Sequence, residues 1–140
     1  MDYAGFWKRV GASIIDTLLT GLFGFLLGAV LAFMSIGMQW SQETTMMLAR
    51  VLQVLCIIFT WLYYTILESS KLQATIGKMA LGLIVTDLAG NRISFGRANG
   101  RYFSKLFSAI PLGFGFIMAG TTAQKQGLHD KISNCLVMSR

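Results

Sequence analysis

The chain has 140 residues, of which 54% are hydrophobic and only 13% are charged, about half of the roughly 25% of charged residues found in soluble domains. Its two cysteines exclude a disulfide scaffold, and a single proline together with long charge-free runs excludes a disordered chain. Twelve Lys and Arg against six Asp and Glu give a formal charge of +6, which in so apolar a chain indicates membrane topology rather than nucleic-acid binding. We therefore expect one mainly α-helical membrane domain over residues 1–140.

The first predicted element is a transmembrane helix over about residues 10–36. No charged residue lies between Asp16 and Glu43, and the window between them is rich in Leu, Phe and Ala. A helix that rises about 1.5 Å per residue needs about 20 such residues to cross the hydrocarbon core. The window is long enough for one complete span.

A second transmembrane helix is predicted over about residues 51–67. This window contains no charge and is bounded by Arg50 and Glu68. About 17 residues are at the short end of the range for a span, but long flanking side chains can extend to the interface. Aromatic residues gather at its far end, from Trp61 to Tyr64, as they do at membrane interfaces.

The segment over about residues 68–105 is predicted to be cytoplasmic, because it contains six of the twelve cations and positively charged loops stay inside. The same rule places the N-terminus and the tail, residues 125–140, in the cytoplasm. Residues 81–86 and 92–95 flank a turn and predict a β-hairpin. Residues 135–138 have similar strand character and could pair with that hairpin.

A third apolar segment, residues 106–124, is interrupted by Pro111 and several glycines. Its short apolar core fits a re-entrant segment at least as well as a full span, and cytoplasmic flanks on both sides favour the re-entrant alternative. The basic stretch before it, residues 92–105, predicts an amphipathic helix on the anionic inner leaflet. We expect the lipid bilayer as a partner and no nucleic acid.

Arg9 and Asp16 are candidates for an intramembrane site. They are seven residues apart and hence project from nearly the same face of the first helix. Asp16 falls inside the hydrocarbon, where a carboxylate costs a few kcal/mol unless it is neutralised or paired. Asp16 is therefore a candidate for binding a proton or a cation near an arginine. The alternative is a helix-end ion pair that orders the fold.

Polar residues also follow one face of the second span, at Gln53, Thr60 and Tyr64. Together with Thr20 of the first span they are candidates to line an aqueous pathway. The alternative is that they form hydrogen-bonding contacts between helices.

Motifs of soluble enzymes are absent from the sequence. His129 is the single histidine, and no spacing suits zinc or haem. Residues 75–78 end in a Gly-Lys step but lack the upstream glycine of a phosphate-binding loop. We expect no catalytic residues, no metal and no cofactor.

Three blocks of the sequence resemble the RDD family of small prokaryotic membrane proteins. They are Ala4-Gly5-Phe6-Trp7-Lys8-Arg9 followed by Ile15-Asp16, then Gln73-Ala74-Thr75-Ile76-Gly77-Lys78 with Leu81-Gly82-Leu83 and Val85-Thr86-Asp87, and finally Gln126-Gly127-Leu128-His129-Asp130-Lys131. The family is named for one arginine and two aspartates. The resemblance places these on Arg9, Asp16 and Asp130, with Asp87 as the alternative for the last.

The resemblance implies an unassigned function with suggested roles in transport, including sodium–proton exchange. We therefore expect a small multi-pass protein of the inner membrane that is a cation or proton transporter, or a subunit of one. Arg9, Asp16 and Asp130 are its candidate binding residues, and Na⁺ or H⁺ is its candidate ion. Two spans cannot enclose a pathway alone, so we expect a homo-oligomer. The alternative is a non-transporting adaptor or assembly protein that docks a protein partner through its cytoplasmic segment.

If both termini are cytoplasmic, Arg9 and Asp130 lie at the same membrane face. We therefore predict a charge-assisted pair between them. From spacing alone, the alternative for Asp130 is an ordinary surface carboxylate in a polar stretch.

Overall fold

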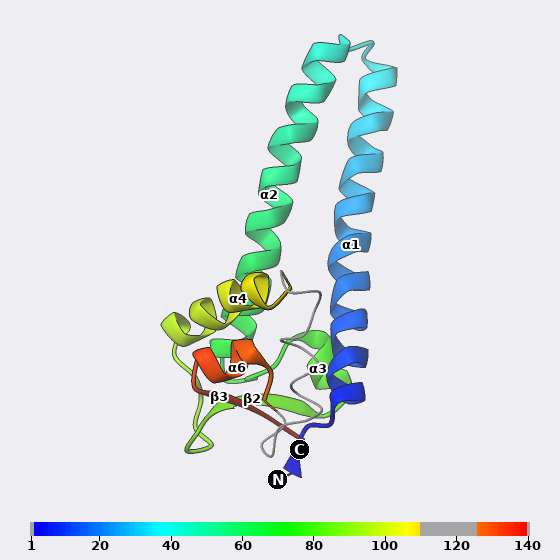
Figure 1. Cartoon of the computed structure of the whole chain (residues 1–140). Coiled ribbons are helices and arrows are strands. Elements are labelled where there is room, and N and C mark those ends of the chain that lie inside the picture. Colours follow the sequence, from blue (N-terminus) through cyan, green and yellow to red (C-terminus); the bar gives the residue numbers. More distant parts are fainter. Residues whose placement is uncertain (1, 110–125, 140) are drawn as a thin grey trace. The chain divides into compact units, whose positions relative to one another are not determined.

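The computed structural model describes residues 2–109 and 126–139 (Figure 1). Its described residues belong to two compact units, which we name the hairpin unit (residues 17–61) and the sheet unit (residues 1–16 and 62–140). The elements in chain order are β1 (Asp2–Tyr3), α1 (Phe6–Gly37), α2 (Gln42–Ser69), α3 (Ile76–Ala80), β2 (Leu83–Asp87), α4 (Phe95–Ala109), α6 (Leu128–Ile132) and β3 (Cys135–Ser139).

Two of these helices are long and apolar enough to cross a membrane, namely α1 and α2. Both contain the predicted spans, and α2 begins well before residue 51 because Ser41 caps it. The Ser41 hydroxyl accepts a hydrogen bond from the Thr44 backbone N–H at 3.1 Å, which satisfies one of the open donors of a helix start. Helix α2 therefore includes polar residues that precede the apolar run.

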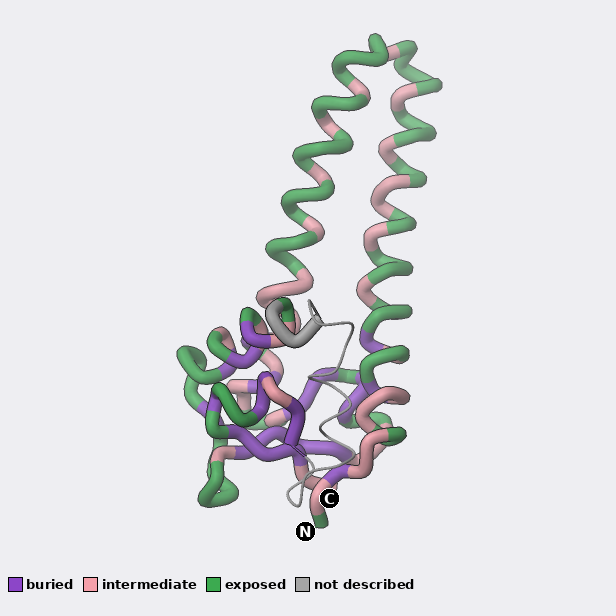
Figure 2. Tube along the Cα trace, viewed as in Figure 1, coloured by how far each residue is buried: buried purple, intermediate pink, exposed green. Residues whose placement is uncertain are grey.

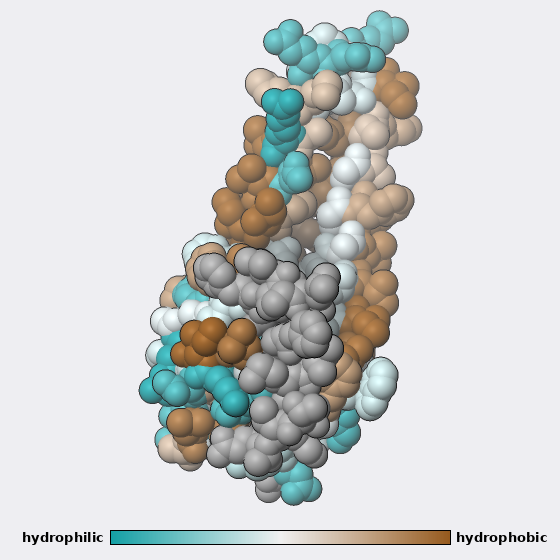
Figure 3. Space-filling view, in the orientation of Figure 1, coloured by the Kyte–Doolittle hydropathy of each residue, from teal (hydrophilic) through white to brown (hydrophobic). Residues whose placement is uncertain are grey.

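Within the hairpin unit, the two helices contact each other through small and aromatic side chains. A Cβ atom built on Gly24 would lie 3.8 Å from the sulfur of Cys56, and the rings of Phe23 and Phe59 stack with their centroids 4.5 Å apart. Most other large apolar side chains of the unit are exposed (Figure 2). Figure 3 shows this apolar surface along both helices. Lipid is the solvent in which such a surface is stable.

The sheet unit contains a three-stranded antiparallel sheet in the order β1-β3-β2. The predicted pairing between the tail and residues 81–86 is confirmed, because Val85 of β2 lies opposite Val137 of β3. The predicted second arm of the hairpin, residues 92–95, is wrong as a strand. It makes one isolated bridge, from Arg92 to Thr86. Strand β1, which the sequence analysis did not predict, takes the other edge of β3.

The hairpin prediction fails because the chain starts a helix directly after the turn. The Ser94 hydroxyl accepts a hydrogen bond from the Arg97 backbone N–H at 3.3 Å, so Ser94 caps α4. The turn itself is held by Asp87, whose carboxylate accepts the N–H groups of Ala89 at 2.9 Å and Asn91 at 2.8 Å. Residues 92–94 are therefore only a short connection.

The hydrophobic core of the sheet unit is small, and half of its members lie on β2 and β3. Buried positions concentrate there rather than along α1 and α2 (Figure 2). Its members are Ala4, Ala12, Leu83, Val85, Ile93, Ala98, Cys135 and Val137. Half of these side chains are Ala or Cys, and a large share of the buried interior consists of polar groups.

Helix α4 is the predicted amphipathic helix, but one of its cations is buried instead of facing lipid. Arg101 is 2% exposed, whereas Phe103 and Leu106 on the same helix are exposed. Residues 106–109 of the predicted third membrane segment form the end of α4. Residues 110–124 of that segment lie outside the described residues.

Candidate functional site

Asp16 forms a buried hydrogen-bond cluster that joins α1 to α2 and α3. It is 1% exposed. Its Oδ1 accepts hydrogen bonds from the Tyr63 hydroxyl at 2.7 Å and from the Gly77 backbone N–H at 2.8 Å. Its Oδ2 accepts one from the Thr75 hydroxyl at 2.5 Å. These three donors are neutral groups, two of which are hydroxyls.

The same cluster completes the start of α3. The first N–H groups of a helix have no partner within it, and here the Ile76 N–H donates to the Tyr63 hydroxyl at 3.1 Å while the Gly77 N–H donates to Asp16. A Cβ atom on Gly77 would collide with the carbonyl oxygen of Ala12 and lie 2.9 Å from Oδ1 of Asp16. Glycine is therefore what allows α3 to approach α1 so closely.

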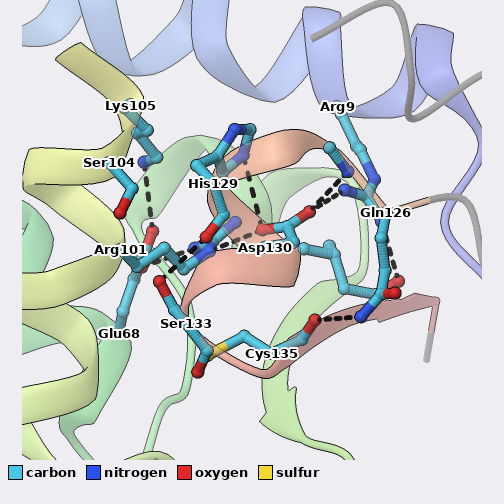
Figure 4. A network of polar contacts seen from close by, with 12 residues as sticks. Arg9, Glu68, Arg101, Ser104, Lys105, Gln126, His129, Asp130, Ser133 and Cys135 are labelled. Atoms are coloured by element: carbon cyan, nitrogen blue, oxygen red, sulfur yellow. Dashed lines mark hydrogen bonds and ion pairs between the residues drawn. The ribbon is translucent and has the colours of Figure 1, made fainter. Parts of the chain in front are cut away.

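Asp130 is the centre of a second, separate cluster (Figure 4). It is 0% exposed, so the surface alternative for this residue is wrong. Its Oδ2 accepts a hydrogen bond from Arg9 at 2.5 Å, and its Oδ1 accepts one from Arg101 at 2.7 Å. Its Oδ2 also accepts the Gly127 N–H at 3.3 Å, so Asp130 caps α6 from within its first turn.

Glu68, near the end of α2, extends this cluster. Its Oε2 accepts a hydrogen bond from Arg101 at 2.5 Å, and its Oε1 lies 2.5 Å from the ammonium group of Lys78 and 3.6 Å from that of Lys105. Arg101 therefore bridges two carboxylates, one on α2 and one on α6. We name the six charged residues of this cluster the ion-pair network: Arg9, Glu68, Lys78, Arg101, Lys105 and Asp130.

Burial and charge act against each other in this network. Burial alone would raise the pKa of Asp130, but the nearby charges of Arg101 and Arg9 hold it below its usual value. Burial would lower the pKa of Arg101, and the two carboxylates raise it instead. Burial, with the repulsion of Arg101, lowers the pKa of Lys78 to about 7 despite Glu68. Burial lowers the pKa of His129 to about 3, against the attraction of Asp130. The guanidinium–carboxylate core is thus fully charged at neutral pH.

The structure divides the three predicted binding residues between the two clusters. The predicted pair of Arg9 and Asp130 is present, whereas Asp16 contacts Tyr63, Thr75 and Gly77. Asp87, the alternative for the third family position, ends β2 just before an exposed turn, and its Oδ2 lies 3.8 Å from the Arg97 guanidinium. Asp130 is therefore the aspartate that meets the arginine.

The four predicted pathway residues have different surroundings. The hydroxyls of Thr20 and Thr60 donate to carbonyl oxygens of their own helices, Thr17 at 3.4 Å and Cys56 at 2.9 Å. Gln53 is exposed on α2. Tyr64 belongs to the sheet unit, where the Lys105 ammonium lies 4.5 Å from its ring centroid. Among the described residues, no group of three or more His, Cys, Asp or Glu could hold a metal ion.

Sequence reasoning missed most of the ion-pair network. Arg97, Arg101 and Lys105 are four residues apart and share one helical face, and that pattern was available. Because aromatic residues lie among these cations and the charge density is modest, the sequence instead favours an amphipathic helix on the anionic inner leaflet. Glu68 was noted only as the boundary of the second span. The positions of Glu68 and Arg101 in the sequence do not indicate that their side chains meet.

Comparisons with known proteins find relatives over nearly the whole chain. The model of the RDD family matches residues 3–134. The uncharacterized protein YxaI of Bacillus subtilis (strain 168) is 33% identical over 146 positions, which cover 96% of each chain. The uncharacterized membrane protein YteJ of the same organism is 27% identical over 97% of this chain and 80% of its own length. No solved structure matches significantly.

Proposed function

The chain belongs to the RDD family, and from this premise we propose that it is a membrane transporter, or a subunit of one, in which Asp16 binds a proton or Na⁺. The observation that carries the proposal is the setting of Asp16. It is a buried carboxylate in a helix long and apolar enough to span a membrane. Neutral hydroxyl and amide groups donate to both of its oxygens. An acidic residue inside a membrane helix is a functional candidate by default.

The chemistry of this cluster suits an exchange of ions. The hydroxyls of Tyr63 and Thr75 can accept as well as donate, so they can turn from donor to ligand when a cation or proton neutralises the carboxylate. Carboxylate, hydroxyl and carbonyl oxygens are the ligands that hard cations take. Asp16 would then be the exchanging group, and the ion-pair network would be its fixed support.

The transport proposal includes an assembly and an orientation. We propose a multi-pass homo-oligomer of the inner membrane, because α1 and α2 alone are too few to enclose a pathway. We place both termini in the cytoplasm. This orientation is supported by the pairing of β1 and β2 with β3, which keeps the N-terminus and the tail on one side, and by the positive charge of that side.

The test is ion flux through proteoliposomes that contain the purified protein, with Asp16→Asn as the variant. The asparagine carbonyl can accept from Tyr63 and Gly77, and its amide can donate to the Thr75 hydroxyl, so the fold should survive. We expect Na⁺-dependent or proton flux in the wild type and none in the variant. Glu43→Gln, which neutralises an exposed acid of the hairpin unit, is the matched control and should retain flux.

Two outcomes would contradict this proposal. Unchanged flux in Asp16→Asn would remove Asp16 from the mechanism. Absence of flux in the wild type, across several cations and pH values, would favour the adaptor alternative, in which the sheet unit docks a protein partner. Under that alternative, Asp16→Asn would lower only stability or assembly.

A further inference from the structure

The ion-pair network contains more positive than negative charge around Glu68. Three cations surround this one carboxylate: Lys78 at 2.5 Å and Lys105 at 3.6 Å share its Oε1, and Arg101 takes its Oε2 at 2.5 Å. Arg101 also serves Asp130, which already has Arg9 as a partner. Four cationic side chains therefore face two carboxylates.

Among the described residues, the ion pairs of these four cations are made with Glu68 and Asp130. The sequence contains six acidic residues, and the other four have different surroundings. Asp16 attracts Lys105 at longer range, but its oxygens accept from Tyr63, Thr75 and Gly77. The other three are Asp2 in the edge strand β1, Glu43 in the hairpin unit and Asp87 in its own turn.

Uncompensated charge is costly in a buried setting, and it is reduced by loss of a proton or by binding a counter-ion. Glu68 and Arg101 are each 2% exposed, whereas Lys78 is 10% and Lys105 is 22% exposed. Arg9 is 13% exposed, but its ion pair is with Asp130. Of the three cations around Glu68, the two lysines are therefore the ones through which an anion could reach the excess charge. Figure 4 shows Lys105 on α4 at one side of the network, with Asp130 between it and Arg9.

We propose that Lys78 and Lys105 bind a phosphate group, supplied either by an anionic lipid headgroup or by a free phosphate. Two ammonium groups beside one oxygen suit an oxyanion with several acceptor oxygens, because each lysine can donate to a different one. Glu68 lies in the last turn of α2, a helix of membrane-span length, which is the depth of lipid headgroups. Basic pockets at the cytoplasmic ends of membrane helices bind such headgroups. The site is separate from Asp16 and does not depend on transport.

The test is thermal unfolding of the full chain in a neutral detergent, titrated separately with short-chain phosphatidylglycerol, phosphatidylcholine and inorganic phosphate. We expect phosphatidylglycerol to raise the unfolding temperature in a saturable way, since a ligand that binds only the folded state stabilises it. Lys105→Gln should weaken the apparent affinity about tenfold, as expected for one charge-assisted hydrogen bond. Lys105→Arg should largely retain it. Lys71→Gln, which removes an exposed lysine of the same unit, is the matched control and should respond as the wild type does.

The arms of the experiment identify the source of the phosphate. A response to phosphatidylglycerol alone identifies a lipid headgroup, and an equal response to inorganic phosphate identifies a free oxyanion. No saturable response to either, or an equal response in Lys105→Gln, overturns the proposal. If Lys105→Gln does not fold, Lys78→Gln is the second variant under the same criteria. Asp16→Asn should keep the lipid response whatever its flux, so this proposal and the transport proposal fail independently.

Discussion

Gly77 has no room for a side chain, because a Cβ atom there would collide with the backbone of Ala12. We expect Gly77→Ala to destabilise the protein by about 1–3 kcal/mol, as overpacking of a tight contact does, because the new methyl group would overlap Ala12 and crowd Asp16. The destabilisation is measured as the change in the free energy of unfolding in detergent, followed by tryptophan fluorescence.

Gly100→Ala is the control, since a Cβ there meets nothing within 4 Å. It should stabilise α4 by about 0.5–1 kcal/mol. Equal effects of the two changes would contradict this account of Gly77.

His129 makes the stability of the protein depend on pH. Burial lowers its pKa from 6.5 to about 3, so below pH 6.5 the unfolded chain binds a proton that the folded chain does not. Stability should therefore fall as the pH falls, by about 1 kcal/mol per pH unit between about pH 6 and 5, above the range in which the buried carboxylates add their own dependence. His129→Gln should be nearly independent of pH in that window. A slope that persists in this variant would assign the effect to another group.

At the scale of elements, Arg9 and Asp130 join α1 to α6 across 121 positions of the sequence. Removing one partner of a buried ion pair costs about 3–5 kcal/mol, because the other charge stays buried. We expect Arg9→Ala and Asp130→Ala each to destabilise the protein, and the double variant to cost less than their sum by about 1–3 kcal/mol.

The control for this double-mutant cycle is Lys8, the neighbour of Arg9 on α1. Its ammonium group donates to the hydroxyl of Ser139 at 3.2 Å in an exposed hydrogen bond. The costs of Lys8→Ala and Asp130→Ala in the free energy of unfolding in detergent should therefore add in the double variant. Additive costs for Arg9 and Asp130 themselves would show that the two residues do not interact.

Elements whose signal is local were predictable from the sequence, and those set by distant contacts were not. The two apolar helices could be predicted from the length of the windows that contain no charged residue. The pairing of β2 with β3 could be predicted because both segments have the composition of strands and both were expected on the cytoplasmic side. Residues 92–95 have similar strand character, but the Ser94 cap starts α4 there. Strand β1 is only two residues long, too short to leave a pattern. Its existence depends on the exposed edge of β3.

Some residues of the candidate site could likewise be predicted from the sequence, and others could not. Arg9, Asp16 and Asp130 could be named from membrane burial and from the family resemblance. Glu68 and Arg101 could not be paired, because their contact joins residues 33 positions apart on two different helices. Periodicity shows which face of a helix is polar, but it does not show which other element covers that face.

For the whole molecule, the sheet pairs β1 and β2 with β3, so the orientation that we propose places the N-terminus, residues 83–87 and the tail on one side of the membrane. We expect cysteines introduced at positions 90 and 139 to be labelled from the same side, and a cysteine at position 40, between α1 and α2, from the opposite side. The background is Cys56→Ala. Cys135 can remain, because it is buried and burial raises the pKa of its thiol. Labelling of positions 90 and 139 from opposite sides would contradict the orientation proposed here.

Of the described strands, the central one, β3, is the last that the ribosome makes. While the tail is still in the exit tunnel, β1 and β2 have no strand between them, and Arg9 and Arg101 have not yet met Asp130. Both long helices are complete by then and can enter the bilayer before the sheet closes. Membrane insertion would thus come first, and the arrival of α6 and β3 would complete the hydrogen-bonding of the sheet and the charge pairing together. A chain that lacks its tail would be inserted but unfinished, and this marks it for quality-control proteolysis.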